Sequence, residues 1–256
     1  MGTIHRIVHT FFNVSILAKT FPELLTVGLR NTALLSLAAM VVGLVVGLVI
    51  AMLLLSQHKS ARIAGRVYVD LFRGLPHIVS IYLIGQGLPL AGIALFGGNT
   101  YAYAALAIGI VEGAYMSEVF RSGIRGLDVG QMEAARSIGM SHMQAMVHVI
   151  LPQAARNILP ALTGQLILVV KNTALVFLLG LSANQRELFA IAQDASSNDA
   201  SLTPLVASGV LYLAITVPLT YLVSALDHRL GRARGQVRQA VVPDPADPDL
   251  AAAGAP

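Results

Sequence analysis

The sequence predicts an all-α integral membrane protein with about five transmembrane helices, and three observations carry that prediction. Of its 256 residues, 55% are hydrophobic and only 12% are charged, whereas soluble domains carry about 25% charged residues. Residues 33–55 contain no charge, and this run exceeds the roughly 20 residues that cross a bilayer as a helix. Basic residues gather at the ends of hydrophobic runs rather than in one patch, which predicts lipid contact and no nucleic-acid partner.

Residues 1–23 are expected to form an amphipathic segment at the membrane surface. Its apolar residues follow helical spacing, at Ile4, Ile7, Val8, Phe11 and Phe12. His9, Asn13 and Lys19 interrupt the stretch and no small-residue cleavage pattern follows, so a signal peptide is not predicted. A frayed terminus is the alternative.

Residues 24–230 are expected to form the membrane domain. The predicted spans are 33–55, 62–88, 100–120, 157–182 and 200–226. Pro76 allows a kink in the second span. Basic residues dominate the loops after the first and third spans and the segment after the fifth, which places the C-terminus inside and the N-terminus outside. Residues 231–256 are expected to form a disordered cytoplasmic tail, because they cannot bury an apolar face.

Small residues repeat every four positions in the first span, at Ala39, Gly43, Gly47 and Ala51. They make one helix face nearly flat, which predicts close packing against another helix. The partner helix is left open between one in the same chain and one in a second copy.

A polar island, residues 128–152, separates the third and fourth spans. It predicts a short helix over 130–138 that is ended by Gly139, since glycine suits the left-handed residue after a helix. Ser141 and Gln144 have the spacing of a capping box, which predicts the start of a second helix closed by Pro152. Glu133 supplies a charge, and Ala134 and Ala135 leave a shallow surface that another protein could approach. The alternative is a surface loop that binds nothing.

A charged residue inside a span costs roughly 2.5–3.5 kcal/mol at the bilayer centre, and two such residues are singled out here. They are Glu112 and Lys171. One interpretation is that they line a polar path, Glu112 facing a substrate ammonium and Lys171 a carboxylate. The other is that they pair with each other or with backbone groups and only hold helices in register. Glu118 and Arg121 are expected to form a structural pair.

Catalytic and metal sites are not predicted. There is no cysteine, His142 and His148 are not spaced as helical metal ligands, and no nucleophile and base stand together. A G-x-x-x-x-G-K-[S/T] phosphate loop is also missing from the sequence. The chain is therefore expected to be neither an enzyme nor an ATPase.

The island "EAARSIGMSHMQAMVHVILP" resembles the cytoplasmic EAA loop of membrane subunits of ATP-binding-cassette (ABC) importers. Five stretches are similar to the polar amino-acid branch of that family: "YVDLFRGLP" (68–76), "GAYMSEVFRSGI" (113–124), "GQMEAARSIG" (130–139), "LPQAARNILP" (151–160) and "KNTALVFLLGL" (171–181). The resemblance covers residues 24–230 and implies a type I ABC importer permease fold. Val149 departs from it conservatively, standing where isoleucine is usual.

The resemblance implies that Glu133, Ala134, Ala135 and Gly139 couple this chain to an ATPase. Lys171, Asn172 and Thr173 open the last of the similar stretches and join Glu112 as substrate-path candidates.

The same resemblance implies an importer subunit for polar amino acids, with basic amino acids a candidate class, in a bacterial inner membrane. The expected partners are a dimer of cassette ATPases, a second permease subunit, identical or paralogous, and an extracytoplasmic binding protein. ATP and magnesium would bind the ATPase, and no cofactor is expected in this chain. The alternatives are a self-sufficient secondary transporter, which would show more spans and internal repeats, and an intramembrane enzyme, which would need a convergent catalytic set.

Overall fold

A computed structural model describes residues 3–241, and within that range every regular element is a helix. The predicted all-α class is therefore confirmed. The α-helices are α1 (Thr3–Phe11), α2 (Val14–Glu23), α3 (Leu29–Leu55), α4 (Lys59–Gly74), α5 (His77–Gly85), α6 (Gly87–Leu90), α7 (Thr100–Arg125), α8 (Val129–Ser137), α9 (His142–Ala145), α10 (Leu151–Asn172), α11 (Leu188–Asn198) and α12 (Thr203–Val241). Two π-helical turns, Leu24–Gly28 and Met146–Ile150, and two 3-10 segments, Thr173–Leu179 and Ala183–Gln185, complete the described elements.

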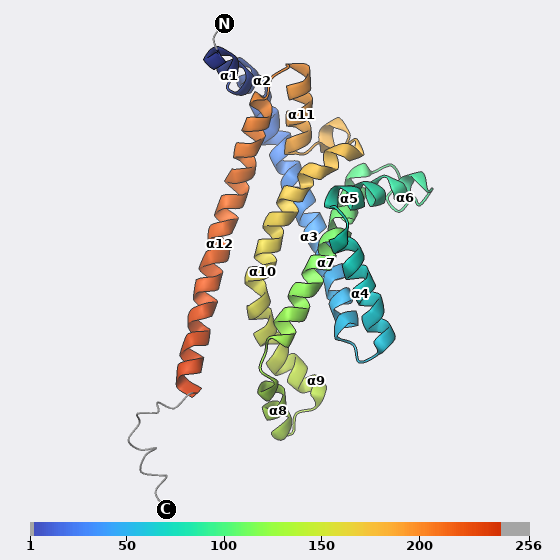
Figure 1. Ribbon diagram of the computed structural model, residues 1–256, viewed down its shortest axis with the longest axis vertical. Coiled ribbons are helices and arrows are strands. Elements are labelled where there is room, and N and C mark those ends of the chain that lie inside the picture. The colour runs from blue at the N-terminus through green and yellow to red at the C-terminus, as the bar shows by residue number, and fades with distance from the viewer. Residues whose placement is uncertain (1–2, 242–256) are drawn as a thin grey trace, which may run out of the picture.

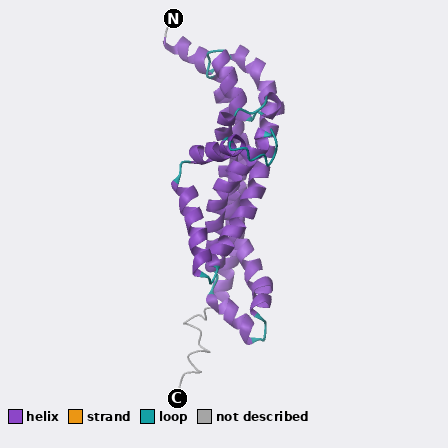
Figure 2. Cartoon of the chain, turned by 90° about the vertical axis from the view of Figure 1, so that its right-hand side faces the viewer, coloured by secondary structure: helices purple, strands orange, loops and turns teal. Residues whose placement is uncertain are grey.

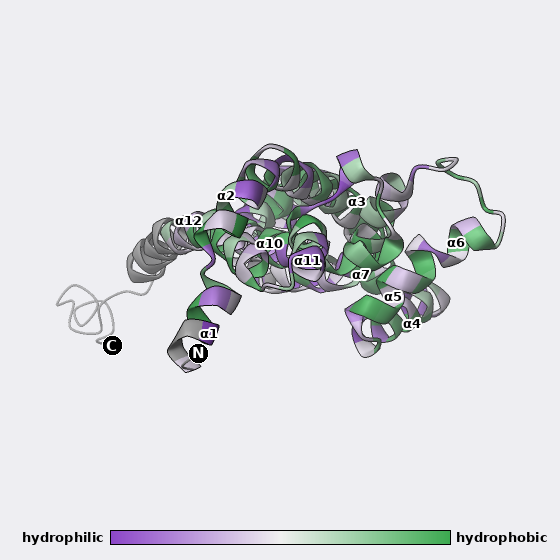
Figure 3. Ribbon diagram, turned by 90° about the horizontal axis from the view of Figure 1, so that it is seen from above, coloured by the Kyte–Doolittle hydropathy of each residue, from purple (hydrophilic) through white to green (hydrophobic). Residues whose placement is uncertain are grey.

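Four stretches of helix are long and apolar enough to cross a membrane, or five if a bent helix pair counts as one span. This agrees with the predicted number. The spanning helices α3, α7, α10 and α12 run along the long axis, with α8 and α9 at one end and α1, α2 and α11 at the other (Figure 1). Seen from above, α12 and the group α4 to α6 lie on opposite flanks of the bundle (Figure 3).

The bent pair corresponds to the second predicted span. Instead of a kink at Pro76, α4 and α5 meet at an angle of 109°. Leu75 is extended, with ψ 144°, because a residue that precedes proline is disfavoured in the α region. The chain therefore leaves the helix at Leu75, and α5 and α6 turn across the bundle rather than along it (Figure 1).

The small-residue face of α3 packs against α7 of the same chain. A Cβ atom added at Gly47 would lie 2.8 Å from Met116 Cβ, and one at Gly109 would lie 2.5 Å from Val42 Cβ. Side chains larger than hydrogen do not fit at these contacts. The predicted close packing is confirmed, and its partner is an intramolecular helix.

The N-terminal segment is tied to the start of α12. Asn13 caps α2 by accepting hydrogen bonds from the backbone N–H groups of Ser15 and Ile16, and its own N–H donates to Thr203 Oγ1 at 2.9 Å. Apolar residues of α1, α2 and the turn between them remain exposed, with Phe12 in the turn at 61% and Val14 in α2 at 77%. Such exposure fits a segment that meets lipid.

Pro152 does not close the second helix of the island, which corrects that prediction. The helix runs without a break from His142 to Leu179, and Pro152 occupies the first turn of α10 after the π-helical turn Met146–Ile150. Proline is tolerated there because its missing N–H group is not needed in a first turn. The predicted tail, 231–256, is helical as far as Val241, and residues 242–256 lie outside the described part.

Candidate functional site

The island forms two short helices, α8 and α9, at one end of the molecule (Figure 1 and Figure 2). Asp128 caps α8 by accepting from Gly130 N at 2.8 Å, and Gly139 follows α8 with φ +90°. Ser141 N donates to Gln144 Oε1 at 2.8 Å and Gln144 N donates to Ser141 Oγ at 3.2 Å, so the predicted capping box is present. Both helix ends are thus fixed by local hydrogen bonds.

The predicted coupling residues separate into outward and inward positions. Glu133 and Ala134 are exposed, whereas Ala135 is only 5% exposed. Gly139 has open space around its Cα, so its role is the left-handed backbone rather than a close contact. Ile138 and Met143 are 74% and 70% exposed, and sequence reasoning did not single them out. The loop therefore presents a charge, a small residue and two apolar side chains to its surroundings.

A second cluster surrounds Glu112 inside the bundle. The Glu112 side chain is 1% exposed, and its Oε1 accepts a hydrogen bond from Asn172 Nδ2 at 2.6 Å. His77 Nε2 lies 3.6 Å from the same oxygen. The cluster thus joins α7, the end of α10, where the helix tightens to 3-10 helix, and the first residue of α5, which follows the break between α4 and α5.

Aromatic stacking extends this cluster outward. The His77 ring stacks on Tyr115 with centroids 5.3 Å apart, and the guanidinium of Arg73 lies 5.4 Å from the centroid of the Tyr115 ring. Sequence reasoning missed His77 because it is far from Glu112 along the chain. The Leu-Pro pair before it, which breaks the helix, was the available signal.

The other path candidates take different positions. Lys171 is exposed, and its side chain makes no ion pair or hydrogen bond within residues 3–241. Thr173 is completely buried and its hydroxyl donates to Val170 O at 2.7 Å. The structure therefore brings Glu112 to Asn172 and not to Lys171. The predicted structural pair is present, with Arg121 Nη2 2.6 Å from Glu118 Oε2.

Glu187 is a buried acid that sequence reasoning did not single out. It is fully buried and caps α11 by accepting from the N–H groups of Phe189 and Ala190. Tyr212 donates its hydroxyl to Glu187 Oε2 at 2.9 Å. Burial raises the pKa of Glu187 to about 7, although these three hydrogen bonds act in the opposite direction.

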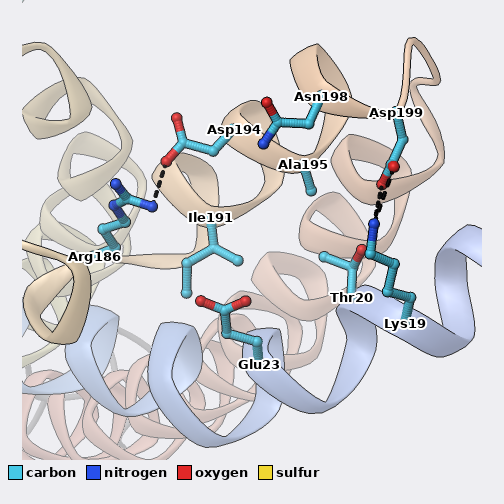
Figure 4. A pocket seen from close by; sticks show the side chains of 9 residues that line it. All are labelled: Lys19, Thr20, Glu23, Arg186, Ile191, Asp194, Ala195, Asn198 and Asp199. Atoms are coloured by element: carbon cyan, nitrogen blue, oxygen red, sulfur yellow. Dashed lines mark hydrogen bonds and ion pairs between the residues drawn. The ribbon is translucent and has the colours of Figure 1, made fainter.

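A polar hollow of about 190 Å³ lies beside α11. Arg186 and Asp194 form an ion pair of 2.7 Å on one side of it, and Lys19 and Asp199 form one of 3.1 Å on the other (Figure 4). Glu23 points toward the space between them (Figure 4). Asp194 and Asp199 are therefore both paired with basic residues of the same chain.

The geometry defines a membrane-spanning helical protein with a capped helical loop at one end and a buried acid, Glu112, in the bundle. Residues 43–232 match the family model described as binding-protein-dependent transport system inner membrane component, and the chain belongs to that family. The resemblance noted from sequence is thereby confirmed.

Relatives and solved structures agree with that assignment. The probable glutamine ABC transporter permease protein GlnM of Bacillus subtilis (strain 168) is 33% identical over 218 residues, covering 85% of this chain and 98% of that protein. The arginine transport system permease protein ArtQ of the same organism is 29% identical over 216 residues, covering 83% and 96%. A crystal structure of an amino acid ABC transporter with histidines has 31% identity and a TM-score of 0.72, covering 83% of this chain and 96% of that one.

Proposed function

We propose that this chain is the permease subunit of an importer for polar amino acids, driven by ATP hydrolysis in a separate cassette ATPase. The observation that carries the proposal is the exposed, doubly capped loop around Glu133, in a chain of the binding-protein-dependent transport family. The caps hold the first turns of α8 and α9 in place, which supports a loop that transmits force. Substrate class follows from relatives that are named for glutamine and arginine transport.

The complete transporter contains a dimer of ATPases, a second permease subunit and an extracytoplasmic binding protein. ATP and magnesium bind the ATPases, and the permease supplies no cofactor. The N-terminus lies outside and the C-terminus inside a bacterial inner membrane, because basic residues concentrate on the side of the α8–α9 loop. The hollow beside α11 then faces the binding protein.

Within this subunit, Glu112, Asn172, Thr173 and Lys171 belong to the substrate path. Their support is position: they lie at or next to the point where α10 changes from α-helix to 3-10 helix. A stretch of 3-10 helix within a longer helix often marks a functional hinge. A self-sufficient secondary transporter is disfavoured, since the family operates with a binding protein.

The test is co-purification in nanodiscs with co-expressed cassette ATPases. Wild type should retain its ATPase, whereas Glu133→Arg reverses an exposed charge on the contact surface and Gly139→Asp places a side chain at φ +90°. Both should lose the ATPase. Gln57→Arg, in the exposed turn before α4, is the control and should retain it. If all variants retained the ATPase equally, the loop would not be the contact site for the ATPase and the proposal would be wrong.

A further inference from the structure

The carboxylate of Glu112 has an unused acceptor. Asn172 satisfies Oε1, but Oε2 is buried with no hydrogen-bond partner among the residues that the structure describes. An ionised carboxylate accepts at both oxygens, and leaving a buried charge unpaired is strongly unfavourable. The geometry around Glu112 therefore lacks a group that is both cationic and a donor.

Nearby cations of the chain do not fill this position. His77 lies on the side of Oε1, which Asn172 already occupies, and its 3.6 Å separation is longer than a hydrogen bond. Arg73 is exposed, and its guanidinium stacks over Tyr115. Neither His77 nor Arg73 therefore supplies the missing partner of this buried oxygen.

A second unused acceptor lies on the same face of α10. Gln165 Oε1 is buried without a hydrogen-bond partner in the described part of the chain. Gln165 precedes Asn172 by seven residues, about two helical turns or roughly 10 Å toward the α8–α9 end. The two remaining buried atoms of this kind are the hydroxyls of Ser80 and Ser196, which can donate as well as accept. The unpaired atoms of α7 and α10, Glu112 Oε2 and Gln165 Oε1, are both acceptors. They would suit a solute that carries several N–H donors.

We propose that Glu112 Oε2 receives an N–H-bearing cation of the transported solute, an alkylammonium or a guanidinium group, and that Gln165 is the next acceptor toward the cytoplasm. The inference rests on the proposed function, because it requires a solute path between α7 and α10. Two sources of the cation share this chemistry: the α-ammonium group of any amino acid and the side chain of a basic one.

The decisive variant is Glu112→Gln, which keeps the shape and the acceptor for Asn172 but removes the charge. Its matched control is Glu118→Gln on the same helix, where the acid is already paired with Arg121 at 2.6 Å. Each permease is assembled with its ATPase in nanodiscs without the binding protein, so that binding is confined to the membrane subunits. Binding of radiolabelled arginine and of glutamine is then measured, and basal ATPase activity is recorded on the same samples.

Wild type should bind arginine, and Glu112→Gln should weaken that binding about tenfold or more, since a charge-assisted hydrogen bond is lost. Glu118→Gln should stay within about twofold, because its charge does not contact the solute. Weakening for arginine alone identifies the side-chain cation, and weakening for both solutes identifies the α-ammonium group.

Equal binding by wild type and Glu112→Gln, or no binding by wild type in samples with normal basal ATPase activity, would overturn the inference while leaving the proposed function intact. Failure of every sample to retain an ATPase would instead count against the proposed function. Gln165→Leu gives a second check, with an expected loss smaller than that of Glu112→Gln because the acceptor is neutral.

Discussion

Two buried acids, Glu112 and Glu187, differ in how completely their carboxylate oxygens are hydrogen-bonded by neighbouring groups. Glu112 and Glu187 are both almost completely buried, yet Glu187 has its acceptors filled by two backbone N–H groups and Tyr212. In Glu112, Oε1 accepts a hydrogen bond from Asn172, whereas Oε2 has no hydrogen-bond partner among the described residues. Sequence alone predicted Glu112, because a charge within an apolar run is visible, and missed Glu187, because a charge in a polar loop is not.

Stability should depend on pH through Glu187. Its folded pKa of about 7 lies above the ordinary value of 4.5, so the folded state binds more protons than the unfolded state between these values. The contribution of the neutral acid is therefore fully present below about pH 4.5 and is lost as pH rises through about 7. The apparent melting temperature of wild type should fall by a few degrees between about pH 5 and 7.5.

Glu187→Gln should flatten this part of the profile, because glutamine does not titrate. The measurement is thermal unfolding of the detergent-solubilised protein at several pH values. Asp194→Asn is the control, since Asp194 is an exposed member of a surface ion pair, and its profile should follow wild type. A Glu187→Gln profile with the wild-type slope would assign the pH dependence to other groups.

Among the elements, α3 and α7 form the contact on which the bundle depends. Gly109→Ala would place a Cβ atom 2.5 Å from Val42 Cβ and 2.9 Å from Ala39 O. The helices must separate to accept it, at an expected cost of about 1–3 kcal/mol. Thermal unfolding of the solubilised protein should show a lower melting temperature.

Gly209→Ala provides the matched control for that experiment. Gly209 also lies within a spanning helix, but nothing stands within 4 Å of an added Cβ atom. Its replacement should be neutral or slightly stabilising, because alanine favours helix more than glycine does. If the two substitutions had the same effect, the α3–α7 contact would be looser than its geometry indicates.

The capping box of the α8–α9 loop leads to a prediction of its own. Ser141→Ala removes the acceptor for Gln144 N and should destabilise the start of α9 by about 1 kcal/mol. Hydrogen exchange at residues 142–145 should become several-fold faster, and ATPase coupling should weaken with it. Ser137→Ala is the control, since that hydroxyl only donates back to Ala134 O. Unchanged exchange in Ser141→Ala would show that the loop is held by other contacts.

At the scale of the whole molecule, sequence predicted the spans and the loop but not how they meet. The spans follow from uncharged length and the loop from capping residues, both of which are local signals. The 109° turn between α4 and α5 was expected only as a kink, because Pro76 marks a break without stating its angle. Contacts such as His77 with Glu112 join distant elements, so no local pattern reveals them.

The unbroken helix from His142 to Leu179 has a mechanical consequence. It begins at the capping box of the loop and passes Asn172, the partner of Glu112. Thirty residues separate His142 from Asn172, or about 45 Å at the usual helical rise. A continuous helix of this kind can transmit a displacement along its axis. When the end at His142 moves, the Asn172 amide that donates to Glu112 Oε1 moves with it. Binding of the ATPase at the loop and binding of a solute at Glu112 would then both depend on the position of this helix along its axis.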